Sequence, residues 1–174
     1  MRHVSLVGFM ASGKTTLGKR LARALSLPFV DTDALITSVH GEIHTIFRNE
    51  GEGTFREYEL QAVHGALSGP PSVIAPGGGA VTHAPTLALL ETRSHMIHLR
   101  VEPKTVFDRL KGAKEIRPML GEQPTVASIE ALYETRRAFY ERAGFSIAVD
   151  TMSATSLVGE IVQWLSTREP LLIP

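Results

Sequence analysis

The chain has 174 residues, of which 43% are apolar and 21% are charged, as is usual for a soluble globular domain. Its 18 basic and 18 acidic side chains cancel, which argues against a general attraction to nucleic acid or to an anionic membrane. The absence of cysteine excludes disulfides, thiolate catalysis and cysteine-bound metals. We therefore expect one cytoplasmic domain over residues 1–174, with no secretory signal, no membrane-spanning segment and no nucleic-acid partner.

Short apolar runs alternate with helix-periodic segments, which predicts a parallel sheet with helices on its faces. In the first half of the chain we expect strands at 4–7, 29–30 and 73–75, with a helix after the first strand. The segment 33–69 is mostly helical in pattern and is broken by Gly41 and by Gly51-Glu52-Gly53. This pattern indicates a helical lobe beside the sheet.

The second half of the chain continues the alternation. We expect, in order, a helix at 86–91, a strand at 96–99, helices at 104–110 and 126–142, a strand near 147–149 and a helix around 157–165. The polar stretch 112–125 has no clear period. A loop of this length inside a compact domain is usually functional or disordered.

Residues 8–15 read Gly-Phe-Met-Ala-Ser-Gly-Lys-Thr and match the phosphate-loop pattern G-x-x-x-x-G-K-[ST] between a predicted strand and a predicted helix. Such a loop turns successive backbone N–H groups into one concavity at the positive end of a helix, which suits a polyphosphate. Lys14 would reach the β- and γ-phosphates, and the Thr15 hydroxyl would bind Mg²⁺. The alternative is an accidental glycine turn, which would match in roughly one such chain in 200.

Two carboxylates, Asp31 and Asp33, follow the second predicted strand, at the edge where ligands of open α/β sheets bind. One could hold magnesium, directly or through water, and the other could orient or deprotonate an acceptor hydroxyl. The alternative is that Thr32 or Asp33 caps the following helix.

Three glycines, 77–79, follow the third predicted strand. Because one or two glycines suffice for a turn, the run suggests a close approach of backbone N–H groups to a ligand, with a structural turn as the alternative. Arg56, Arg117 and Arg136 could bind carboxylate or phosphate bidentately, although any one of them alone is more often a solvated surface residue.

Some aromatic residues and histidines have structural interpretations. We expect Trp164 to pack against the edge of the sheet, and we expect no metal at His40 and His44. Three phenylalanines could either line an acceptor pocket or fill the helical lobe, namely Phe47, Phe55 and Phe139.

Taken together, these motifs resemble the shikimate kinases, a family within the P-loop nucleoside-monophosphate-kinase-like group. The match runs in order, with similar spacing, from Gly8 to about Asp150. The segments that carry it are the loop 8–15, Asp31-Thr32-Asp33, Phe47 through Gly51-Glu52 to Phe55-Arg56, Gly77-Gly78-Gly79-Ala80, Arg117-Pro118-Met119-Leu120, and Arg136 followed by Tyr140.

The resemblance implies an α/β, three-layer P-loop NTPase fold with a five-stranded parallel sheet in the order 2-3-1-4-5. It also implies a helical substrate-binding lobe at 33–69 and a mobile lid at 111–125. The implied activity is ATP- and Mg²⁺-dependent phosphorylation of shikimate to shikimate 3-phosphate, in chorismate and aromatic amino acid biosynthesis. The implied oligomeric state is a monomer.

By the same resemblance, the catalytic residues would be Lys14, Asp33 and Arg117. Shikimate would meet Asp33 through its hydroxyls, Arg56 and Arg136 through its carboxylate, and the backbone of Gly78 and Gly79. Thr15 and Asp31 would hold the metal. The nucleotide would contact Gly8, Ala11, Ser12, Gly13, Lys14, Thr15, Thr16, Arg109 and Arg117.

Two other functions share part of this pattern. Another small kinase of the same architecture, acting on gluconate or a nucleotide, would have the loop and the lid, but Arg56 with Arg136 suits a small acid better. A nucleotide-dependent switch without an acceptor is a different class of protein, and no guanine-reading N-K-x-D stretch supports it.

Overall fold

The computed structural model describes residues 2–111, 119–121 and 123–169. Within them, five strands form one parallel sheet in the order β2-β3-β1-β4-β5, which confirms the predicted order. The strands are β1 (His3–Val7), β2 (Phe29–Asp31), β3 (Val73–Ala75), β4 (Ser94–Arg100) and β5 (Phe145–Ala148).

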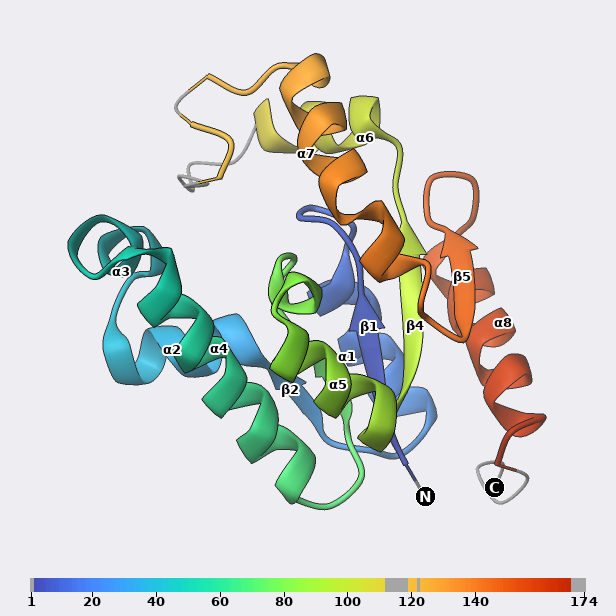
Figure 1. Cartoon of the computed structure of the whole chain (residues 1–174). Coiled ribbons are helices and arrows are strands. Elements are labelled where there is room, and N and C mark those ends of the chain that lie inside the picture. Colours follow the sequence, from blue (N-terminus) through green and yellow to red (C-terminus); the bar gives the residue numbers. More distant parts are fainter. Residues whose placement is uncertain (1, 112–118, 122, 170–174) are drawn as a thin grey trace.

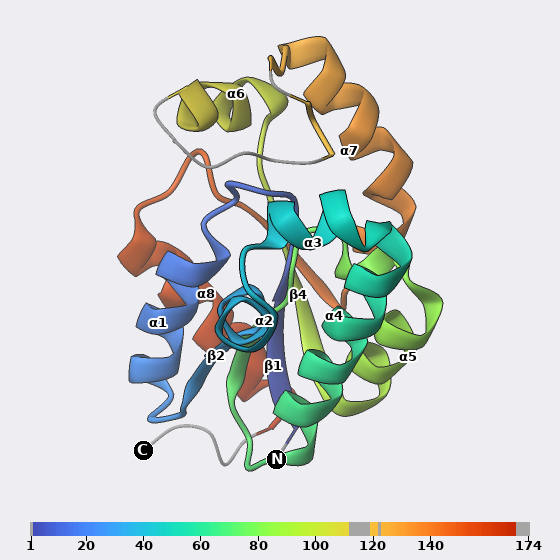
Figure 2. The same cartoon turned by 90° about the vertical axis from the view of Figure 1, so that its left-hand side faces the viewer.

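Helices cover both faces of this sheet, so the fold has three layers (Figures 1 and 2). Helices α1 and α8 lie on one face, and α4, α5 and α7 lie on the other (Figure 2). The helices are α1 (Lys14–Ala24), α2 (Thr32–His40), α3 (Ile43–Asn49), α4 (Gly51–Ser68), the 3₁₀ turn η1 (Ala80–Thr82), α5 (Ala84–Arg93), α6 (Pro103–Lys111), α7 (Val126–Tyr140) and α8 (Ala154–Ser166).

The central strand β1 is buried along its whole length between β3 and β4. Strands of a parallel sheet covered on both faces are mostly apolar, as β1 is apart from His3 and Ser5. Helix α1 packs closely on the sheet because Gly18 has no Cβ, which would collide with the ring of Phe29. The glycine-rich loop follows β1 and so lies at the carboxyl edge of the sheet, at its centre.

The helical segment after β2 consists of three helices: α2 and α3 lie beyond the β2 edge of the sheet, and α4 returns along the face that also carries α5 (Figures 1 and 2). Gly41 and Gly51 separate them with φ of +85° and +87°, a left-handed conformation that favours glycine. The predicted break at Gly41 is confirmed. The second break lies at Gly51, and Gly53 continues inside α4 because its backbone is helical.

Other local predictions differ in outcome. Trp164 stacks on Phe145 of the edge strand β5, with ring centroids 5.2 Å apart, which confirms its packing role. Strand β5 begins two residues earlier than predicted, and the turn η1 was not predicted. None of the helices in the described part of the chain has the length and apolar character needed to cross a membrane.

Candidate active site

The loop between β1 and α1 folds back on itself at the carboxyl end of the central strand. Gly13 and Ala11 adopt left-handed backbone conformations, with φ of +89° and +57°, and α1 begins at Lys14. A Cβ at Gly8 would lie 2.7 Å from the carbonyl oxygen of Leu99, so this position requires glycine. The loop therefore forms a backbone concavity at the N-terminus of α1, an arrangement that binds anions.

A cavity of about 770 Å³ opens over this loop. The Nζ of Lys14 donates hydrogen bonds to the carbonyl oxygens of Gly8 (2.8 Å) and Phe9 (2.9 Å). The buried Oγ of Ser12 has no hydrogen-bond partner among the described residues. A buried hydroxyl, a lysine and helix N-terminal N–H groups together fit a polyphosphate. Of the predicted nucleotide contacts, the cavity is lined by Ala11, Ser12, Gly13, Lys14, Thr15, Thr16 and Arg109.

Two predicted nucleotide contacts are not among the described lining residues. Gly8 is not a lining residue and packs behind the loop. Arg117 lies outside the described residues. Arg109, on α6, donates from Nη1 to the carbonyl oxygen of Ala11 at 2.6 Å, which ties α6 to the phosphate loop.

Thr15 and Asp31 meet at the floor of this cavity. The Thr15 hydroxyl donates to one oxygen of Asp31 at 2.7 Å, and the other oxygen accepts from the N–H of Ala34 at 3.3 Å. Asp31 is therefore the N-cap of α2, and the alternative that Thr32 or Asp33 caps this helix is wrong.

The same pair was predicted to hold magnesium. A hydroxyl and a carboxylate side by side are the oxygen ligands that Mg²⁺ prefers. Within the described ranges no group of three or more His, Asp or Glu side chains could hold a metal ion. The Thr15–Asp31 pair therefore fits a magnesium ion whose remaining ligands are phosphate oxygens and water.

A second cavity, of about 120 Å³, adjoins the first. Five residues line both cavities and form the common wall, namely Met10, Asp33, Thr37, Ile43 and Gly78. Phe47 and Phe55 line this cavity, whereas Phe139 packs against the main core. The charged and glycine residues that line it are Asp33, Arg56, Glu59, Gly77, Gly78, Gly79 and Arg136, together with Glu42 and His44.

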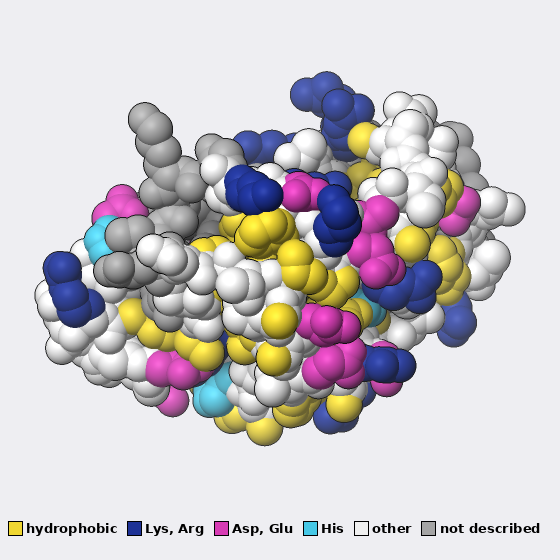
Figure 3. Space-filling view, turned by 90° about the horizontal axis from the view of Figure 1, so that it is seen from above, with side chains coloured by type: hydrophobic (Ala, Val, Ile, Leu, Met, Phe, Trp, Pro, Cys, Tyr) yellow, Lys and Arg dark blue, Asp and Glu magenta, His cyan; other side chains and the backbone are white. Residues whose placement is uncertain are grey.

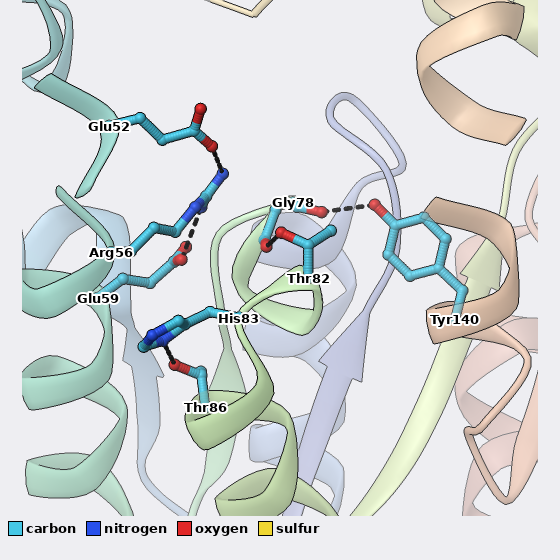
Figure 4. A network of polar contacts seen from close by, with 9 residues as sticks. Glu52, Arg56, Glu59, Gly78, Thr82, His83, Thr86 and Tyr140 are labelled. Atoms are coloured by element: carbon cyan, nitrogen blue, oxygen red, sulfur yellow. Dashed lines mark hydrogen bonds and ion pairs between the residues drawn. The ribbon is translucent and has the colours of Figure 1, made fainter. Parts of the chain in front are cut away.

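Arg56 is held between two carboxylates of its own helix, α4 (Figure 4). Its Nη1 contacts Glu59 at 2.7 Å and its Nη2 contacts Glu52 at 2.9 Å. Glu59 is fully buried, and burial raises its pKa to about 7 although Arg56 acts to lower it. The pair thus places a buried guanidinium and a buried carboxyl group in one cavity.

Glu59 was missed in the sequence analysis. Glu59 lines the second cavity, and its Oε1 has no hydrogen-bond partner among the described residues. The available signal was its spacing of three residues from Arg56, because residues three apart lie on the same face of a helix.

The glycine run leaves room for the side chains packed around it. A Cβ at Gly77 would collide with Glu59 and lie 2.8 Å from Asp33, and a Cβ at Gly79 would lie 2.5 Å from Arg56. A turn alone would not need three glycines. The run therefore lets the charged groups of α2 and α4 pack directly on the loop after β3.

Arg136, on α7, supplies the second guanidinium of this cavity. It is 4% exposed, and its guanidinium carbon lies 5.7 Å from the ring centroid of Phe9, next to the phosphate loop. Arg56 and Arg136 therefore line one cavity from different helices, as a carboxylate-binding site requires. Seen from above, acidic and basic side chains are interspersed over the visible surface (Figure 3).

A phosphate loop on the central parallel strand, joined to a cavity that can hold an acceptor, defines a P-loop kinase. The model of the shikimate kinase family matches residues 10–166. A curated shikimate kinase from Symbiobacterium thermophilum is 39% identical over 95% of this chain and 97% of its own length. Another, from Sulfurihydrogenibium sp., is 36% identical over 97% of this chain and 100% of its own length. The chain belongs to the shikimate kinase family and is a kinase that uses ATP.

Solved structures agree with this assignment. The shikimate kinase from Acinetobacter baumannii, in complex with shikimate, is 31% identical with a TM-score of 0.90 and covers 97% of this chain and 95% of its own. A gluconokinase from Sinorhizobium meliloti has a TM-score of 0.63 at 17% identity, which shows the shared fold alone.

Proposed function

We propose that this protein transfers the γ-phosphoryl group of ATP to the 3-hydroxyl of shikimate, with the nucleotide in the larger cavity and the acid in the smaller one. The observation that carries the proposal is the wall shared by the two cavities. Asp33 belongs to this wall, with Lys14 on one side and the two buried arginines on the other.

On the nucleotide side, the loop backbone and Lys14 would hold the phosphates. Lys14 already reaches across the loop to two carbonyl oxygens, and it would turn toward the β- and γ-phosphates when they are present. Thr15 and Asp31 would hold Mg²⁺, which supplies charge neutralisation to the phosphate oxygens. Because transition states of phosphoryl transfer are loose, positioning and charge neutralisation supply most of the rate.

On the acceptor side, Arg56 and Arg136 would bind the carboxylate of shikimate. Arg56 is engaged by Glu52, whose side chain is 48% exposed and can turn to solvent when the acid arrives. Asp33 would then orient the acceptor hydroxyl toward the phosphates and accept its proton. The predicted role of Arg117, closing over the phosphates, stays a prediction.

The function is tested by an ADP-release assay with shikimate, gluconate, nucleoside monophosphates or no acceptor. We expect strong stimulation by shikimate alone. Equal ADP release without an acceptor, or stimulation by another member of the panel instead, would contradict the proposal. The cytoplasmic location and the monomeric state stay predictions, which cell fractionation and sedimentation would test.

A further inference from the structure

Tyr140 holds the glycine loop from outside the two cavities. It is the last residue of α7 and is fully buried, and its hydroxyl donates a hydrogen bond of 2.5 Å to the carbonyl oxygen of Gly78. Tyr140 lines neither cavity, whereas Gly78 lines both. Figure 4 shows Tyr140 and Arg56 on opposite sides of Gly78. The hydroxyl therefore binds the glycine loop on the side away from Arg56.

This hydrogen bond orients one peptide unit. In a trans peptide the C=O and the following N–H point in opposite directions. With the Gly78 carbonyl turned toward Tyr140, the N–H of Gly79 turns away from it, on the side where Gly79 lines the acceptor cavity. A peptide between two glycines rotates easily because neither has a Cβ. Such a peptide needs an anchor to present its N–H in one direction.

The same hydrogen bond links the elements that carry or contact the two arginines of the acceptor cavity. Arg136 precedes Tyr140 by one helical turn on α7, and its charge opposes the rise that burial causes in the pKa of Tyr140. Gly79, next to the anchored carbonyl, packs on Arg56 of α4. One hydrogen bond thus connects the helix that carries Arg136 to the loop that touches Arg56.

The ring of Tyr140 is held independently of its hydroxyl. It stacks on His98 of β4, with centroids 5.0 Å apart and an interplanar angle of 16°, and lies 6.0 Å from the ring of Tyr133. Burial, more than the nearby charge of Arg100, lowers the pKa of His98 to about 4, so the stack is neutral at neutral pH. Removing the hydroxyl alone should therefore leave the ring in place.

We propose that Tyr140 is a positioning residue of the acceptor site: its hydroxyl sets the direction of the Gly78–Gly79 peptide and the placement of Arg136 relative to Arg56. The acid then meets a preformed set of donors. This inference rests on the proposed function, because it takes shikimate as the acid that these donors bind.

The test compares Tyr140→Phe with Tyr133→Phe. Tyr133 is a matched control because it lies on the same helix and touches the same aromatic cluster, while its hydroxyl makes no hydrogen bond to any described residue. We expect Tyr140→Phe to raise the KM for shikimate by about five- to tenfold, as the loss of one hydrogen bond predicts, with the KM for ATP changed less than twofold. Tyr133→Phe should behave like the wild type.

A purely structural role would lower the melting temperature of Tyr140→Phe without moving the KM for shikimate, and this result would overturn the proposal.

The amide NMR signal of Gly79 in the wild-type protein gives a second measurement that does not depend on folding of the variant. It should shift on addition of shikimate, and a signal that stays in place would overturn the proposal as well. If the wild type shows no shikimate-dependent ADP release, the proposed function itself fails; a wild type that is active beside an unchanged Tyr140→Phe removes only the role of Tyr140.

Discussion

The nucleotide side and the acceptor side of the active site are built in different ways. The nucleotide side is centred on one continuous segment, 10–17, which lines the larger cavity at the start of α1, with Asp31 and Arg109 beside it. The acceptor side brings together side chains from α2, α4 and α7 around the glycine loop. The first depends on local backbone conformation, whereas the second depends on how distant elements pack.

The electrostatics of the two sides differ in the same way. Lys14 rests on backbone carbonyls, which are weak partners that a phosphate can replace. Arg56 is buried against the carboxyl groups of Glu52 and Glu59. Breaking a buried ion pair by removing one partner is strongly destabilising. Substitutions on the acceptor side should therefore lower the free energy of unfolding more than substitutions on the nucleotide side do. The predictions below test this contrast.

The largest effect is expected on the nucleotide side. Lys14→Ala should lower kcat by about a thousandfold because a preorganised charge at the transferring group is lost, while the melting temperature changes little. Lys19→Ala, an exposed lysine of the same helix, is the control. Steady-state ADP release and thermal melting measure both, and a normal kcat for Lys14→Ala would contradict the proposed site.

The next effect falls on the shared wall. Asp33→Asn should lower kcat by about a hundredfold, because it removes both proton acceptance and part of the alignment of the acceptor hydroxyl. Asp108→Asn, at an exposed ion pair with Lys104, should leave kcat unchanged. Near-normal turnover by Asp33→Asn would rule out this role for Asp33.

On the acceptor side, Arg136→Ala should raise the KM for shikimate by about thirtyfold, the expected loss for charge-assisted hydrogen bonds to a carboxylate. The neighbouring Arg137 is exposed and pairs with Glu141 on the same helix, so Arg137→Ala is a matched control that should be neutral. Equal KM values for the two variants in the ADP-release assay would show that Arg136 does not bind the acid.

The smallest effect concerns the pH dependence of stability. Because burial raises the pKa of Glu59 to about 7, the folded state favours the protonated form. The stability from this group is complete below its unfolded pKa, near 4.5, and is lost as pH rises to about 7. Between pH 5 and 7.5 the free energy of unfolding of the wild type should therefore fall by on the order of 2 kcal/mol relative to Glu59→Gln. Urea unfolding of both proteins measures this difference, and parallel pH profiles would contradict it.

The two sides also differ in how well the sequence predicts them. The phosphate loop and the alternation of strands and helices follow from contiguous patterns, so the loop 8–15 and the parallel sheet were predicted correctly, whereas the strand order came from the family resemblance. The hydrogen bond from Tyr140 to Gly78 joins positions 62 residues apart, and no local sequence pattern predicts it. Likewise, the cap of α2 falls on Asp31 rather than on its neighbours because the end of β2 sets the geometry of that turn. Contacts between distant elements required the structure.

The most direct test of the two-cavity account is a crystal structure with shikimate and a non-hydrolysable ATP analogue. We predict that the triphosphate lies on the loop 8–15, that the carboxylate of shikimate lies between Arg56 and Arg136, and that its 3-hydroxyl lies about 3–3.5 Å from the γ-phosphorus. Shikimate bound elsewhere, or with its carboxylate turned away from both arginines, would contradict the account.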